Sequence, residues 1–192
     1  MTKSRIEAFS DGVIAIIITI MVLELKVPHG AEWADLAGVG TVFLCYIFSF
    51  VNLAIYWGNH HHLMHTVHQV NSKIIWSNLH LLFWLSIVPF TTAWMGENHF
   101  AELPLAAYSV NLLLCAISYY FLQQTIMADH THSTKLIIAL KKQEKKGTAS
   151  LIIYILCVVF AFIVPLVSEI LIVAVGVMWV IPDKNIERAL KD

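Results

Sequence analysis

Residues 5–25 read Arg-Ile-Glu-Ala-Phe-Ser-Asp-Gly-Val-Ile-Ala-Ile-Ile-Ile-Thr-Ile-Met-Val-Leu-Glu-Leu, a short polar start followed by a long aliphatic run. Between Gly12 and Leu23 the one polar residue is Thr19. At about 1.5 Å of rise per residue, a helix over 6–25 spans roughly 30 Å, which is the thickness of the hydrocarbon core of a bilayer. The stretch therefore predicts a helix that crosses a membrane.

One face of this predicted helix differs from the others. Gly12, Ile16, Thr19 and Leu23 recur at intervals of three or four residues, so they share a face. A polar group at membrane depth is costly unless it meets protein, water or its own backbone. Two interpretations stay open: an ordinary first span whose Thr19 bonds the backbone one turn back, or a face that meets water or neighbouring helices.

The composition indicates an integral membrane protein. Of the 192 residues 58% are apolar and 13% charged, and the mean hydropathy is +0.73. So much apolar surface cannot be buried inside one small soluble domain. The net charge of -1 gives no reason to expect a nucleic-acid partner. The three cysteines lie in apolar runs, so we expect buried thiols rather than a disulfide framework.

Six apolar segments predict an all-α protein with six transmembrane helices in one domain, residues 1–192. The expected spans are about 6–25, 34–57, 73–95, 103–126, 149–165 and 167–181. Pro28 and Gly30 end the first segment, and Pro89 lies inside the third. The last two segments are predicted to form a tight hairpin at Pro165, because 147–181 is too long for a single span.

The basic residues predict the orientation. With six spans both termini lie on one side, which also holds Lys3, Arg5, Lys73, Lys135, Lys141, Lys142, Lys145, Lys146, Lys184, Arg188 and Lys191. The other side has a single basic residue, Lys26. The positive-inside rule therefore places both termini in the cytoplasm. Residues 135–142 are interpreted either as an amphipathic helix on anionic lipid of the inner leaflet or as a solvated linker.

The opposite side is predicted to be acidic, and it carries Glu24, Glu32, Asp35, Glu97, Glu102 and Glu169. An acidic outer mouth would concentrate cations. Ordinary polarity beside a membrane explains the same residues equally well.

The start of the chain resembles a known family. Arg5, Phe9, Ser10, Asp11 and Gly12, spaced Arg-x-x-x-Phe-Ser-Asp-Gly, resemble the signature of the transmembrane protein 175 potassium channel family. The resemblance continues in three weaker pieces over about the first hundred residues, namely Tyr46-x-x-Ser49-Phe50, Trp57-x-x-His60-His61, and Pro89-Phe90-Thr91 followed by Gly96-Glu97.

This resemblance implies a function and an assembly. It implies a homotetramer in a prokaryotic plasma membrane, with the first helix of each subunit lining a pore on the oligomer axis. That pore would pass K⁺ and other monovalent cations and need no cofactor. Carried over by position, Ile16 is expected to form the narrow hydrophobic constriction, Thr19 a ring of hydroxyls and Leu23 a second apolar ring. A ring of isoleucines can act as a gate by excluding water.

The signature residues are also expected to form a structural network. A carboxylate near lipid requires a partner, and Asp11 lies near the same predicted boundary as Trp57, His60 and His61. We hypothesise a polar cluster of Arg5, Ser10, Asp11 and one or more of those three residues, with Phe9 beside it in the signature. This cluster would fix the base of the first helix.

The histidines after the second span allow a second hypothesis. His61 and His65 are four residues apart and His65 and His68 three, spacings at which two imidazoles can share a metal ion. No acidic residue or cysteine lies between Trp57 and Lys73 to complete such a site, so a helix end whose rings bond water and backbone is the plainer interpretation.

No catalytic motif is visible, and we do not expect an enzyme. Two alternatives to a channel remain open. One is a proton- or metal-linked secondary transporter that uses Asp11 and the histidines. The other is a non-conducting scaffold that uses the first helix as an oligomerisation seam.

Overall fold

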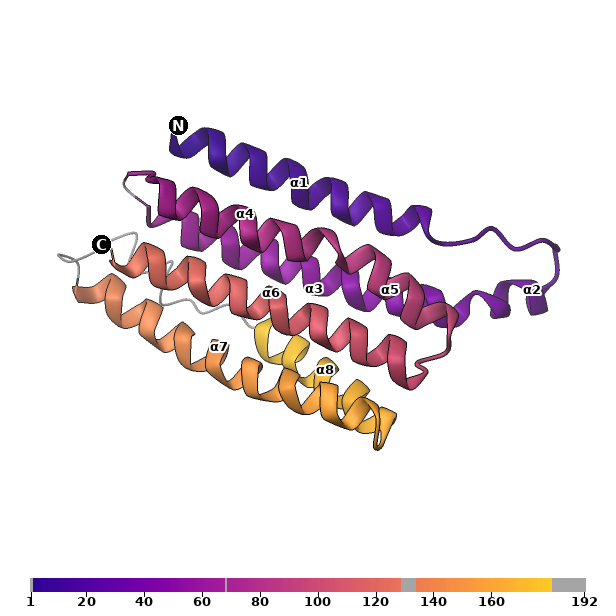
Figure 1. Cartoon of the computed structure of the whole chain (residues 1–192). Helices are drawn as coiled ribbons and strands as arrows, with labels where there is room; N and C mark the ends of the chain where they lie inside the picture. Colours follow the sequence, from indigo (N-terminus) through magenta and orange to yellow (C-terminus); the bar gives the residue numbers. More distant parts are fainter. Residues whose placement is uncertain (1, 68, 129–133, 181–192) are drawn as a thin grey trace.

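The computed structural model describes residues 2–67, 69–128 and 134–180 (Figure 1). All regular structure in these residues is helical. In chain order the helices are α1 (Lys3–Leu23), α2 (Trp33–Gly38), α3 (Gly40–His65), α4 (Ser72–Ser86), α5 (Val88–Glu97), α6 (Glu102–Ala128), α7 (Thr134–Ala161) and α8 (Pro165–Val180). The predicted all-α class is confirmed for this part of the chain.

Four segments of the described chain are long and apolar enough to cross a membrane. They are α1, α3, the continuous stretch Ser72–Glu97 made of α4 and α5, and α6. These match the first four predicted spans to within a few residues at each end, apart from α3, which begins at Gly40 and runs on to His65. α8 is a shorter apolar helix of 16 residues.

The third predicted span is broken into two helices. α4 ends at Ser86 and α5 begins at Val88, with Pro89 in its first turn. Proline has no N–H to donate to the carbonyl four residues earlier, and its ring crowds that carbonyl, so a continuous helix cannot pass through Pro89 without a defect. The break follows directly from this residue.

α7 differs from the prediction of a separate segment at 135–142. It runs unbroken from Thr134 through the Lys-rich stretch to Ala161. The reason is a set of contacts with α6: Leu140 and Gln143 are buried, Gln123 donates to the Leu140 carbonyl at 2.8 Å, and Gln124 donates to Glu144 at 2.7 Å. This part of α7 therefore packs on protein.

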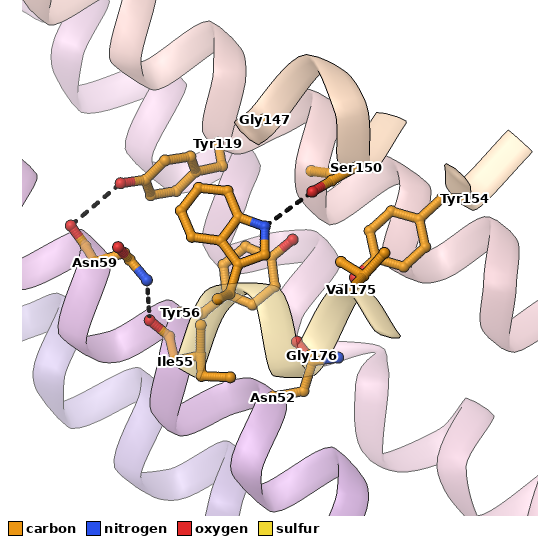
Figure 2. Close-up of a pocket in the computed structure, with 12 residues that line it drawn as sticks. Asn52, Ile55, Tyr56, Asn59, Tyr119, Gly147, Ser150, Tyr154, Val175 and Gly176 are labelled. Carbon is orange, nitrogen blue, oxygen red and sulfur yellow. Dashed lines mark hydrogen bonds between the residues drawn. The ribbon is translucent and has the colours of Figure 1, made fainter. Parts of the chain in front are cut away.

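α7 and α8 form the expected hairpin. The chain reverses at 162–164, and Pro165 is the first residue of α8, where a missing N–H removes no helical bond. The Trp179 indole of α8 donates to Ser150 of α7 at 2.8 Å beside a cavity of about 40 Å³ between α3, α6, α7 and α8 (Figure 2).

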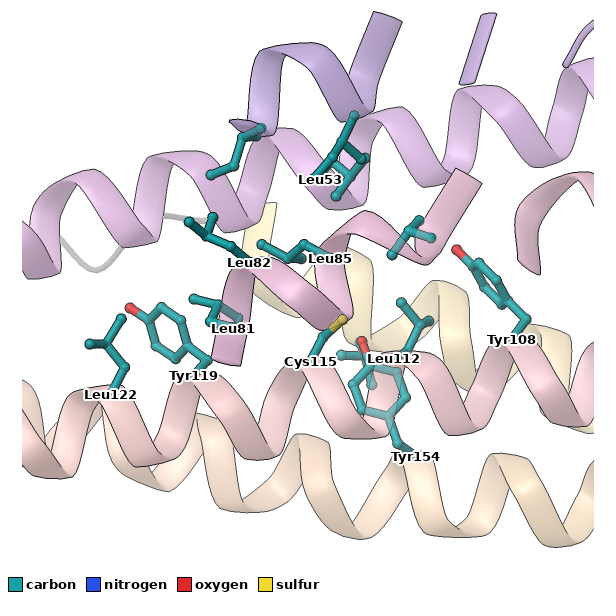
Figure 3. Packing of buried hydrophobic residues seen from close by; sticks show 14 of the residues in the cluster. Leu53, Leu81, Leu82, Leu85, Tyr108, Leu112, Cys115, Tyr119, Leu122 and Tyr154 are labelled. Atoms are coloured by element: carbon teal, nitrogen blue, oxygen red, sulfur yellow. The ribbon is translucent and has the colours of Figure 1, made fainter. Parts of the chain in front are cut away.

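The hydrophobic core is built around α6. Leu112, Cys115 and Leu122 of α6 are fully buried and face leucines of α3 and α4 and Tyr154 of α7 (Figure 3). Cys45, Cys115 and Cys157 are free and buried, as the sequence predicted.

The long helices lie side by side (Figure 1). The start of α1 lies at the same end as the starts of α4 and α7, whereas α2 lies at the opposite end (Figure 1). Lys26, beyond the end of α1, makes an ion pair with Glu97 at the end of α5 at 2.6 Å. Lys26 and Glu97, which the sequence predicts to lie on the same side of the membrane, are thus in contact in the fold.

Candidate pore-lining helix and the polar network at its base

α1 packs against its own subunit through one face only. Ile6, Ser10, Ile14, Ile17 and Met21 are buried against the other helices. α1 has its contacts with α3, α4 and α5. The opposite face is left uncovered, although it is almost entirely apolar.

The residues predicted to line a pore are on this uncovered face. Ile16 is 58% exposed, Leu23 is 79% exposed, and Thr19 and Gly12 are exposed as well. Helical geometry sets Thr19 opposite the centre of the buried face. Single aliphatic side chains at a surface are ordinary, but a continuous exposed stripe along a membrane helix has to meet lipid, another subunit or a pore.

The Thr19 hydroxyl forms a hydrogen bond to the backbone of its own helix. Its Oγ1 donates to the Ile16 carbonyl at 2.9 Å, one turn back along the helix. The hydroxyl hydrogen therefore points to the backbone, and the oxygen lone pairs are left on the exposed face. A ring of such oxygens can coordinate a cation. The same bond also fits the plainer interpretation, a threonine satisfied within its own helix.

Asp11 and Trp57 lie together at the base of α1. The Trp57 indole Nε1 donates to Asp11 Oδ1 at 2.9 Å and joins α1 to α3. The Trp57 ring also stacks on His61, with centroids 6.2 Å apart. Trp57 is 47% exposed, so this link lies at the edge of the subunit rather than in its core.

A second chain of bonds lies next to it and is fully buried. Asn78 Nδ2 donates to Ser10 Oγ at 2.9 Å, and Ser10 donates in turn to the Ile6 carbonyl at 2.8 Å. His60 Nε2 and Asn78 Oδ1 are 2.7 Å apart. Because the Asn78 oxygen can only accept, His60 carries its proton on Nε2 in this arrangement. Ser10, His60 and Asn78 are each at most 1% exposed, and they join α1, α3 and α4.

Asn78 was missed by the sequence reasoning. The available signal was a carboxamide inside an otherwise apolar span, which requires a partner at that depth. Its partners come from two other helices, and their identity depends on helix packing that local spacing does not encode.

Other predicted members of the network are placed differently. Arg5 is exposed, and among the described residues it makes no ion pair with Asp11. Phe9 is 50% exposed on the uncovered side of α1. His61 is exposed and its ring lies 4.5 Å from that of His65, centroid to centroid.

The described residues do not form the metal site that the histidine spacing allowed. His68 lies outside the described residues. Within the described ranges no group of three histidine, cysteine or acidic side chains is placed to hold a metal ion.

Two of the weaker motifs contribute Ser49 and Thr91 to a further polar cluster near the break between α4 and α5. Ser49 Oγ lies 2.8 Å from the Tyr108 hydroxyl and accepts from Thr92 at 2.8 Å, which ties α3, α5 and α6 together. Asn111 of α6 donates to the Trp84 carbonyl at 2.9 Å and accepts from Thr91 at 3.1 Å. Asn111 thus bridges the last turn of α4 and the first turn of α5.

The chain is similar to several known proteins. Residues 5–89 match the family described as the endosomal/lysosomal potassium channel TMEM175. The chain is 50% identical over 192 residues to a potassium channel of Chryseobacterium sp. (strain P1-3), covering 100% of both chains. It is 30% identical over 132 residues to the endosomal/lysosomal proton channel TMEM175 of Rattus norvegicus, covering 62% of this chain and 26% of the rat protein.

The fold is similar to a solved structure as well. The match is the crystal structure of a lysosomal potassium-selective channel TMEM175 homolog from Chamaesiphon minutus, with a TM-score of 0.79 and 26% sequence identity. The alignment covers 94% of this chain and 97% of that chain, so it extends well beyond the signature region.

Proposed function

Because the chain belongs to the TMEM175 potassium channel family, as the signature around Asp11 predicted, we propose that it forms a homotetrameric potassium-permeable channel with α1 of each subunit lining a central pore. Its relatives are cation channels and not enzymes, which supports a cation channel here.

The observation that carries the proposal is the uncovered face of α1. A subunit of 192 residues is small for enclosing a pore by itself, so a pore would lie on the symmetry axis of an oligomer. The stripe of Gly12, Ile16, Thr19 and Leu23 is the face of the first helix that its own subunit leaves free. Four such stripes turned toward one axis would enclose a narrow apolar channel with one hydroxyl ring.

In this arrangement each ring has a separate role. Four Ile16 side chains would meet at the narrowest point and exclude water until the helices tilt or the side chains change rotamer. Thr19 oxygens would replace part of the hydration shell of a passing cation. One ring of threonine hydroxyls offers fewer and less rigidly held oxygen ligands than the stacked rings of backbone carbonyls in other potassium channels. The sequence has no Thr-Val-Gly-Tyr-Gly filter. Selectivity for K⁺ over Na⁺ is therefore expected to be modest.

We further propose that α7 and α8 complete six spans, with both termini in the cytoplasm of a prokaryotic cell. Lys3, Lys73, Lys141 and Lys145 lie on segments that start at one end of the bundle, and Lys26 lies at the other. The positive-inside rule makes the lysine-rich end cytoplasmic.

The test is potassium flux from liposomes that contain the purified protein, wild type beside Ile16→Asn. A polar side chain at the constriction should hydrate it, so Ile16→Asn is expected to raise flux. The matched control is Ile152→Asn, the same substitution at an α7 position of 57% exposure, and it should leave flux unchanged. Proton flux is measured in parallel, because the rat relative is named a proton channel.

The alternatives make different predictions in the same experiment. A coupled transporter would show saturable flux that requires a second ion and depends on His61 or His65. A scaffold would show no flux in any variant while keeping its oligomeric size. Either result would contradict the proposed pore.

A further inference from the structure

A groove to which α1 contributes no residue lies between α3, α5, α6 and α8. Its volume is about 210 Å³, and its wall includes Phe48, Phe100 and Tyr108 together with Met95 and Val173. Glu169, in the second turn of α8, is the one charged side chain in this wall. No α1 residue lines it, so the groove is separate from the proposed pore.

The turn between α5 and α6 places the Phe100 ring in the groove wall, and its backbone adopts an unfavourable conformation there. His99 and Phe100 have φ values of 48° and 59°, in the left-handed region that bulky residues avoid. Such a conformation persists only where surrounding contacts hold it in place. Here the partly buried Phe100 ring packs against the core and forms part of the groove wall.

Glu169 lacks a partner in this wall. Among the residues that the structure describes, it makes neither an ion pair nor a hydrogen bond, and the one ion pair found there joins Lys26 to Glu97. Glu169 is partly buried, and a carboxylate that lies among apolar side chains is costly unless a cation or a proton meets it. The groove therefore has aromatic and aliphatic walls and one unmatched negative charge.

These features define the chemistry of a ligand, and we propose that the groove binds a small hydrophobic ammonium compound. Its ammonium group would pair with the Glu169 carboxylate, and its apolar body would lie against Phe48, Phe100 and Tyr108. Aromatic faces attract ammonium groups as well as apolar carbon. The space is sufficient, because a cavity of about 150 Å³ already accepts a benzene ring.

An inorganic cation is a poorer match for the same groove. Such an ion requires several oxygen ligands to replace its hydration shell. Apart from the carboxylate, the side-chain oxygen in the wall belongs to Tyr108, which is already bonded to Ser49 at 2.8 Å. An organic cation has no such requirement, since its carbon atoms are satisfied by the apolar wall.

The test is isothermal titration calorimetry with phenethylammonium on the full-length protein in phosphatidylcholine nanodiscs, whose lipid carries no primary ammonium group. We expect saturable binding to the wild type. Glu169→Gln should weaken it about ten- to a hundredfold, the loss expected for a charge-assisted bond. The matched control Glu102→Gln, at an exposed position outside the groove, should bind like the wild type. The neutral analogue 2-phenylethanol should bind wild type and Glu169→Gln alike.

Two further variants keep the test decisive. Val173→Phe narrows the groove and leaves the carboxylate in place, so it should also weaken binding, which covers the case of a poorly folded Glu169→Gln protein. Ile16→Asn should bind phenethylammonium like the wild type, whatever it does to potassium flux. The proposal is overturned if the wild type shows no saturable binding, if Glu169→Gln or Val173→Phe binds phenethylammonium like the wild type, or if Ile16→Asn abolishes binding and so locates the ligand in the pore.

Discussion

Replacing Asn78 by leucine should destabilise the protein strongly, although the two side chains have similar volumes. The change removes the acceptor of the buried His60 Nε2–H and the donor to Ser10. A buried donor without a partner costs about 1–3 kcal/mol, and a lost hydrogen bond to a hydroxyl that keeps its bond to the Ile6 carbonyl costs about 0.5–1.5 kcal/mol. We therefore expect a loss of about 2–4 kcal/mol in the free energy of unfolding, a factor of about 30 to 1,000 in the equilibrium constant.

The assay is reversible unfolding in mixed micelles, followed by tryptophan fluorescence, in a cycle of Asn78→Leu, His60→Leu and the double variant. Once both partners are apolar no orphaned donor remains, so the double variant should cost less than the two single costs added together, by about 1–2 kcal/mol. Ser10→Ala removes the acceptor of the Asn78 Nδ2–H, and Ser86→Ala is its control, because both hydroxyls bond their own helix and Ser86 is exposed. A cost below about 0.5 kcal/mol for Asn78→Leu, or strictly additive costs, would refute the network.

Three more outcomes are expected. Trp57→Phe removes the donor to Asp11, and it should lower the yield of assembled tetramer in size-exclusion chromatography with little change in reversal potential; normal yield with altered selectivity would contradict the structural role. Thr19→Val keeps the side-chain shape without the hydroxyl, so potassium flux should fall several-fold at unchanged yield, whereas unchanged flux would remove Thr19 from the pathway. Asn111→Leu removes one hydrogen bond from the Trp84 carbonyl and one from Thr91, and it should lower stability by about 2 kcal/mol in the same unfolding assay, a cost that near-wild-type unfolding would disprove.

The shared face of Gly12, Ile16, Thr19 and Leu23 could be predicted because it follows from local periodicity, whereas its exposure depends on how α1 packs. A helix repeats every 3.6 residues, so Gly12, Ile16, Thr19 and Leu23 had to share a face whatever the rest of the chain did. The break in the third span was detectable in part, since Pro89 was recognised within it but not used to divide the helix. The position of the break, at Ile87, follows from the carbonyl that proline cannot satisfy.

Contacts between helices were harder to predict. Two contacts depend on how α1, α3 and α4 pack against one another, which no single segment encodes. They are the bond between Asp11 and Trp57 and the link from Ser10 to His60 through Asn78. Arg5 was assigned to the cluster on sequence proximity, but six residues of helix carry it to an exposed position. The continuity of α7 was missed for a related reason, because its basic residues suggested a separate segment on lipid or in solvent, whereas Leu140 and Gln143 are buried and this part of α7 packs on α6.

The most direct test of the central claim is chemical access to the uncovered face of α1 in the conducting protein. Thr19→Cys is compared with Ile152→Cys, an exposed α7 position, while potassium flux is recorded as a charged, membrane-impermeant methanethiosulfonate reagent is added. The native cysteines are at most 2% exposed and form a silent background. The account predicts that flux is blocked in Thr19→Cys and unaffected in Ile152→Cys. Unchanged flux in Thr19→Cys, at full expression and normal oligomeric size, would contradict a water-filled pore lined by the first helix.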